Sequence, residues 1–149
     1  MGIYYLDTSA LVKLYVRESG TERLLALVGG SKETRLAILA LAQVELRSAI
    51  RRRERNGDIP AALATQVLEA FKRHAESRFV IQRVTDFVLD IASVLVDRYA
   101  LRALDAVQLA GYAELQRAAG AETATFVCSD QELLAAATQE RFVVLNPCS

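Results

Sequence analysis

The chain has 149 residues, 52% of them hydrophobic and 24% charged, which excludes a disordered protein and indicates a packed core in one domain over 1–149. Its 18 basic and 18 acidic residues balance, so net charge indicates neither a nucleic-acid nor a membrane partner. The opening "MGIYYLD" does not resemble a signal peptide, and the apolar run at 36–44 is too short to cross a bilayer. The two cysteines have neither disulfide-framework nor zinc-site spacing, and we expect a cytoplasmic protein with no membrane partner.

The first half of the chain alternates between short β-rich runs and helical patterns. A strand at 2–7 leads into a helix in "TSALVKLYVRE", and a second short helix opens at Gly20-Thr21 and closes at Gly29-Gly30. "TRLAILA" (34–40) predicts a buried strand. A long helix then begins near residue 42 and ends at Asn56-Gly57, which is a typical C-terminal stop.

The second half repeats this alternation. Pro60 suits the start of a helix to about residue 76, "RFVIQRV" (78–84) predicts a strand, and Thr85 caps a helix to about residue 99. A further helix ends at Gly120, and strands at 124–128 and 141–147 enclose the helix in "DQELLAAATQE". Such an order predicts an α/β three-layer sandwich, in which helices flank a central and mainly parallel sheet.

Four acidic residues lie where a surface role does not explain them. Asp105 and Glu45 each occupy the apolar stripe of a predicted helix, with aliphatic residues four positions before and after. Asp7 and Asp130 follow the first and fourth predicted strands. An ionised carboxylate in apolar surroundings is costly unless a positive group compensates it, so each position calls for a partner.

The predicted sheet brings these four acids toward one edge. Ligands of open α/β sheets bind beyond the carboxyl ends of the strands, and both strand-end aspartates lie there if the strands are parallel. Converging carboxylates raise one another's pKa, and a hard divalent cation such as Mg²⁺ or Mn²⁺ relieves that repulsion through oxygen ligands. The sequence therefore predicts a metal site built from Asp7, Glu45, Asp105 and Asp130.

Each acid taken singly has a simpler explanation. Asp7 and Asp130 could cap the helices that follow them. Glu45 and Asp105 could instead pair with buried arginines, for example Arg102 or Arg52. One metal site explains all four positions together, and we therefore prefer it.

The segments around these acids resemble the PIN-domain ribonucleases, in particular the VapC-type toxins of bacterial and archaeal toxin–antitoxin pairs. "YYLDTSALVKLY" (4–15), "QVELRSAI" (43–50), "LRALDAVQLA" (101–110) and "FVCSDQELLAAA" (126–137) are similar to the four acidic segments of that family, and "FVVLNP" (142–147) to its closing strand. The resemblance covers nearly the whole chain in the same order. Gln108 departs from it, because many relatives have histidine there, and so does "SD" at 129–130, which replaces a frequent threonine-led version.

The resemblance implies metal-dependent endonucleolytic cleavage of RNA by a protein that is usually a dimer. It also implies an antitoxin partner that blocks the acidic pocket. In the mechanism we expect, Asp7, Asp105 and Asp130 contact the metal directly or through water, and Glu45 holds or positions a water molecule. Ser9 and Ser129 would hydrogen-bond waters or the scissile phosphate.

The only basic concentration is "RSAIRRRERNG" (47–57). Arg47, Arg51 and Arg55 recur at four-residue spacing, and Arg52 lies seven residues after Glu45, so that these arginines could hold an RNA backbone beside the acids. A solvated helix face screened by Glu54 is the plain alternative.

Two other functions compete with the nuclease. A receiver-type phosphoacceptor domain would need a pair of acids near the N-terminus and a lysine at a late strand end, and this chain has neither. A catalytically silent PIN-like interaction module would keep the fold but bind metal weakly. The sequence does not indicate which RNA is cut, at what motif, or whether one or two ions act.

Overall fold

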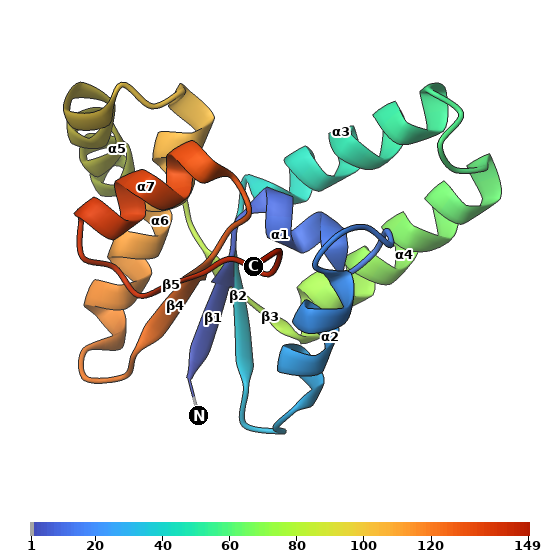
Figure 1. Cartoon of the computed structure of the whole chain (residues 1–149), viewed down its shortest axis with the longest axis horizontal. Helices are drawn as coiled ribbons and strands as arrows, with labels where there is room; N and C mark the ends of the chain where they lie inside the picture. Colours follow the sequence, from blue (N-terminus) through green and yellow to red (C-terminus); the bar gives the residue numbers. More distant parts are fainter. Residues whose placement is uncertain (1) are drawn as a thin grey trace.

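The computed structural model describes residues 2–149 as a five-stranded sheet between two layers of helices (Figure 1). All strand pairs are parallel, in the order β3-β2-β1-β4-β5, which confirms the predicted three-layer α/β class. The strands are β1 (Ile3–Leu6), β2 (Arg35–Leu39), β3 (Phe79–Gln82), β4 (Ala124–Val127) and β5 (Val144–Leu145). The helices are α1 (Thr8–Lys13), α2 (Thr21–Gly29), α3 (Ala42–Arg55), α4 (Ala61–Ser77), α5 (Asp86–Tyr99), α6 (Ala103–Ala119) and α7 (Gln131–Gln139).

The alternation of side chains along β1 divides the core in two. Tyr5 lies in the cluster under α5, α6 and α7, whereas Leu6 lies in the cluster under α1 to α4. Both side chains are fully buried. A parallel sheet covered on both faces needs strands that are apolar on both sides, which is why "IYYL" and "RLAIL" read as nearly continuous apolar runs.

Two predicted elements are shorter than expected. The helix predicted through residue 18 ends at Lys13, because the next turn tightens to bonds from Leu14 N to Leu11 O and from Tyr15 N to Val12 O. The strand predicted at 141–147 was wrong in extent, since only Val144 and Leu145 pair with β4. Arg141 has a left-handed backbone (φ 64°), and the amide of Phe142 donates to Ala137 O at the end of α7, so this segment first closes the helix.

Gly111 allows α6 to lie close to the sheet. A Cβ placed on it would come within 2.5 Å of Leu39 Cδ1 and 2.6 Å of the Tyr5 hydroxyl oxygen. The close approach brings the Tyr5 hydroxyl to the backbone oxygen of Gln108, to which it donates a hydrogen bond at 2.8 Å. Among residues 2–149, no helix has both the length and the apolar character that crossing a membrane requires.

Candidate active site

Four helices begin at the edge of the sheet where β1, β2 and β4 end (Figure 1). Asp7 is the N-cap of α1 and Asp130 the N-cap of α7, while Glu45 and Asp105 lie in the first turns of α3 and α6. Helix N-termini carry partial positive charge and stabilise nearby anions. All four predicted acids therefore gain some stabilisation from the helix that holds them.

Asp7 is the most buried of the four acids, with 4% of its surface exposed. Its Oδ1 accepts hydrogen bonds from Ala10 N at 2.9 Å and from Ser9 Oγ at 2.7 Å. Burial raises the pKa of Asp7 to about 6 despite these bonds, and the nearby charge of Asp105 adds to the rise. The protein therefore keeps a carboxyl group in a place where ionisation is costly.

Asp105 lies half-buried near the other acids. Burial raises its pKa, and the charges of Asp130 and Glu45 raise it further, while Arg102 opposes them. Asp130 is exposed, and its Oδ1 accepts a hydrogen bond from Leu133 N at 3.0 Å. Asp7 and Asp130 are thus helix caps as well as site candidates, and capping occupies only Oδ1 of each.

A hydrogen-bond network holds Glu45. Its Oε1 accepts a bond from Thr8 Oγ1 at 2.8 Å and another from Gln108 Nε2 at 2.9 Å. Gln108 Nε2 also donates to Thr8 Oγ1 at 3.0 Å, and the glutamine side chain is only 3% exposed. This network orients one carboxylate oxygen and leaves Oε2 outside it. Nothing in the sequence assigned this role to Thr8 or Gln108.

No ion pair inside residues 2–149 neutralises these acids, and the charge of Arg102 only partly offsets the rise in the pKa of Asp105. Within residues 2–149, none of the four forms an ion pair, so the alternative explanation, in which Glu45 or Asp105 pairs with Arg52 or Arg102, is wrong. The negative charge of the site also affects Tyr5. Burial raises the pKa of its hydroxyl, and the charges of Asp7 and Glu45 raise it further.

The described acids do not form a closed protein cage, so a divalent cation held by them would keep part of its water shell. Residues 2–149 contain no group of three or more His, Cys, Asp or Glu side chains arranged to hold a metal ion by themselves. Mg²⁺ commonly binds one or two carboxylates and keeps several of its waters. Asp105, whose pKa the charges of Asp130 and Glu45 raise and which has no ion pair in residues 2–149, is a suitable ligand for such an ion.

The two predicted serines connect the ends of β1 and β4. Ser9 Oγ donates to Asp7, and it accepts from Ser129 N at 3.2 Å and Ser129 Oγ at 3.3 Å. Cys128 is buried behind them, and burial, with the charge of Asp7, raises the pKa of its thiol. The serine pair therefore fixes the position of Asp7 relative to the loop after β4.

The four predicted arginines do not lie together. Arg52 lines a cavity beside Ser9 and Ser129, whereas Arg47 lines a different one between α3 and α4. Arg51 pairs with Glu54 at 2.7 Å on the surface, and Arg55 is exposed. Arg53 and Lys13, which the sequence did not single out, line the cavity with Arg52.

Comparison with known proteins identifies the family. The family model of the PIN domain matches residues 4–119. The chain belongs to the PIN-domain family. This PIN domain is 31% identical over 146 residues to Ribonuclease VapC47 of Mycobacterium tuberculosis, and the match covers 96% of each chain.

Solved structures share its fold. A toxin–antitoxin complex from Klebsiella pneumoniae superposes with a TM-score of 0.63 at 18% identity, covering 99% of this chain and 98% of that one. VapC20 of Mycobacterium tuberculosis, a toxin that cleaves the sarcin–ricin loop, superposes with a TM-score of 0.65 at 17% identity, covering 89% and 94%. At such identities these structures support the fold alone.

Proposed function

We propose that this PIN domain, one domain over residues 1–149, is a Mg²⁺- or Mn²⁺-dependent endoribonuclease that acts as the toxin of a toxin–antitoxin pair. One observation carries the proposal: four carboxylates face one edge of the sheet, and none has an ion pair in residues 2–149. The 31% identical ribonuclease supports RNA as the substrate.

The carboxylates have distinct roles in this proposal. Asp7, Asp105 and Asp130 would hold the cation directly or through water. Burial, and to a lesser extent the charges of neighbouring acids, raise the pKa values of Asp7 and Asp105, and a bound cation would offset both effects. Such a cation, when bound, lowers the pKa of water and stabilises charge on the phosphate as a Lewis acid.

Glu45 and the serines position the reacting groups. The hydrogen bonds from Thr8 and Gln108 fix Oε1 of Glu45, so that Oε2 can accept a hydrogen bond from a water molecule. Ser9 holds Asp7 in place and is itself held by Ser129; the Ser129 hydroxyl would have to turn from Ser9 in order to donate to the scissile phosphate, whereas its oxygen can accept from water as it stands. The geometry is built to orient carboxylate oxygens, which is the requirement for assisted attack of water on a phosphodiester.

We also propose a cytoplasmic homodimer with an antitoxin partner. The toxin–antitoxin complexes among the structural relatives support such a partner, which would enter and block the acidic site. Phe87 and Val94 on α5, each 51% exposed, and Leu104 on α6, 52% exposed, offer apolar surface for the second copy. Light scattering of the parent and of Val94→Glu tests this: we expect a dimer and a monomer, and a monomeric parent contradicts the dimer.

Cleavage assays with Asp7→Asn and Asp105→Asn test the nuclease. With Mg²⁺ or Mn²⁺ present, each substitution should lower the cleavage rate by about 100-fold or more, because it removes a charge that binds the cation. Asp90→Asn is the matched control, since Asp90 is an exposed acid on α5, and it should cleave like the parent. Cleavage that survives both site substitutions, or that persists in EDTA, contradicts the proposal.

The silent interaction module is the alternative, and the observation in its favour is that residues 2–149 contain no ready-made group of three or more metal ligands. Titration calorimetry with Mn²⁺ separates the two. A nuclease should bind the ion in the parent and lose that binding in Asp105→Asn, whereas a silent module binds weakly in both.

A further inference from the structure

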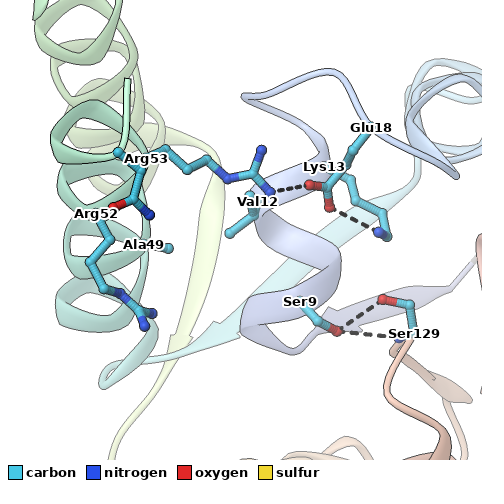
Figure 2. Close-up of a pocket in the computed structure, with 9 residues that line it drawn as sticks. Ser9, Val12, Lys13, Glu18, Ala49, Arg52, Arg53 and Ser129 are labelled. Atoms are coloured by element: carbon cyan, nitrogen blue, oxygen red, sulfur yellow. Dashed lines mark hydrogen bonds and ion pairs between the residues drawn. The ribbon is translucent and has the colours of Figure 1, made fainter. Parts of the chain in front are cut away.

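A cavity of about 410 Å³ lies between α1 and α3 (Figure 2), and its lining residue Ser9 donates a hydrogen bond to Asp7. Arg52 and Arg53 reach it from α3, and Lys13 and Ser9 line it from α1. Ser129, from the loop after β4, completes the wall nearest to Asp7. The cavity and the candidate active site therefore share the Ser9–Ser129 contact.

The helical repeat explains which arginines face this cavity. Ala49, Arg52, Arg53 and Asn56 all line it, and their spacing of three, four and seven residues places them on one face of α3. Glu45 lies seven residues before Arg52 and so belongs to the same face. Arg51 lies on the opposite side of the helix.

Cations outnumber anions in the cavity. Glu18 is the only acid that lines it, against Lys13, Arg52 and Arg53, so the excess is two positive charges, three minus one. Glu18 Oε1 accepts from Lys13 Nζ at 2.9 Å, and its Oε2 pairs with Arg53. Arg52 is exposed and, within residues 2–149, makes neither an ion pair nor a side-chain hydrogen bond.

We propose that this cavity binds a backbone phosphate of the RNA strand next to the phosphodiester that is cut. The inference rests on the proposed nuclease function and adds a subsite to it. The guanidinium group of Arg52 and the remaining N–H groups of Arg53 would donate to the non-bridging oxygens, because arginine matches phosphate with paired donors. Glu18 pairs with both Lys13 and Arg53, so it holds Arg53 in place and leaves Arg52 as the cavity cation without an ion pair among residues 2–149.

A phosphate fits better than the carboxylate of a protein partner because of where the cavity lies. Ser9 lines the cavity and also donates a hydrogen bond to Asp7, so a strand whose scissile phosphodiester is at Asp7 and Asp105 can reach the cavity with a neighbouring phosphate. Repulsion from the acids would push the strand away, and the neighbouring excess of positive charge offsets that repulsion.

Binding of a fluorescent single-stranded oligoribonucleotide, followed by anisotropy in EDTA over a salt series, tests the subsite. All proteins carry Asp105→Asn, so that the probe is not cleaved. Arg52→Ala should weaken binding by about three- to tenfold and lower the slope of log Kd against log salt by about 0.7, the value for one lost phosphate contact on a single strand. Arg51→Ala removes the same charge on the opposite face of α3 and should change either quantity little.

The double variants Arg52→Ala/Arg53→Ala and Arg47→Ala/Arg51→Ala extend the comparison with equal charge changes. Equal weakening by both pairs, or by neither, overturns the subsite. An oligoglutamate peptide provides the other test: if its binding depends on Arg52 while RNA binding does not, the cavity takes carboxylates and the inference is wrong. Cleavage by the parent with Mg²⁺ is scored separately, so a failed subsite and a failed nuclease are distinguishable.

Discussion

The basic cavity and the acidic site both include residues of α1 and α3, but they differ in how their buried charges are compensated. In the basic cavity, Glu18 pairs with both Lys13 and Arg53, and Lys13 is only 6% exposed. Among the acids, Asp7 is as well buried, yet within residues 2–149 no cation pairs with it.

This difference distinguishes a charge that is paired within the fold from a charge that is left available to bind a ligand. Lys13 has its counter-ion in the fold, and the pair stabilises the turn after α1 without outside help. Asp7 has only hydrogen bonds and a helix N-terminus, and these leave its pKa raised to about 6. Groups with perturbed pKa values and no ion pair, gathered at one edge of a sheet, are typical of functional sites, because binding and catalysis use charges that the fold itself does not neutralise.

The largest expected difference between the two regions is in how the free energy of unfolding depends on pH, because among residues 2–149 Asp7 lacks a counter-ion and Lys13 has one. The pKa of Asp7 is about 6 in the folded protein and 3.8 in the unfolded chain, so the folded state binds more protons between these values. Stability of the metal-free protein should therefore fall as pH rises from 4 to 6, by up to about 3 kcal/mol. Asp7→Asn removes this titration and keeps a good N-cap, so in EDTA at pH 7 it should be more stable than the parent.

Urea unfolding in EDTA at pH 4 and pH 7 measures this. The gap between Asp7→Asn and the parent should be small at pH 4 and largest at pH 7, while Asp90→Asn should track the parent at both. Adding Mg²⁺ should stabilise the parent and not the variant, since only the parent retains the ligand. Equal stability of parent and variant at pH 7 would show that Asp7 ionises without cost.

The next effect concerns orientation instead of charge. Gln108→Leu removes the amide that donates to Glu45 and Thr8, while the bond from Tyr5 to the backbone oxygen of residue 108 can remain. Loss of a group that orients a site carboxylate should lower kcat/KM by about 10- to 100-fold. Gln108→His should restore much of the loss, because a ring N–H can donate to Glu45.

Gln116→Leu is the matched control for Gln108→Leu. Gln116 lies on the same helix and also makes two side-chain hydrogen bonds, to the backbone of Glu122 and Ala124, away from the acids. It should reduce stability without a comparable change in kcat/KM. If both leucine variants lose activity in parallel with their stability, Gln108 has only a structural role.

Much of the fold could be predicted from local signals. The stop at Asn56-Gly57 and the cap at Thr85 correspond to observed helix ends, since capping and chain reversal depend on nearby residues. The strand predicted at 141–147 failed because tertiary packing closes α7 first and leaves a two-residue edge strand. Its apolar residues indicate burial, which a strand and a packed loop share.

The acids of the site were visible in the sequence because each breaks an apolar pattern, and their part in catalysis stays a prediction. Their partners were not visible. Glu18 pairs with both Lys13 and Arg53. The pair with Arg53 depends on how α1 and α3 pack, which no local sequence pattern indicates. Capping and ligand binding likewise could not be separated in advance, because Asp7 and Asp130 cap with Oδ1 and keep the other oxygen out of those bonds.

The smallest effect tests the basic cavity by removing its only acid. Glu18→Gln keeps an oxygen for Lys13 and raises the charge excess in the cavity from two to three. If a phosphate binds there, RNA affinity should increase by about 1.4- to fivefold, the size expected for a solvent-screened charge worth about 0.2–1 kcal/mol. Glu22→Gln is the control, because Glu22 pairs with Arg17 outside the cavity, and both side chains are largely exposed.

Anisotropy at low salt should resolve the two variants, and the gain from Glu18→Gln should disappear when Arg52→Ala is added. An unchanged or weaker affinity in Glu18→Gln would mean that RNA does not bind at the cavity. The basic cavity and the acidic site would then differ only in whether the fold supplies a counter-ion for their charges.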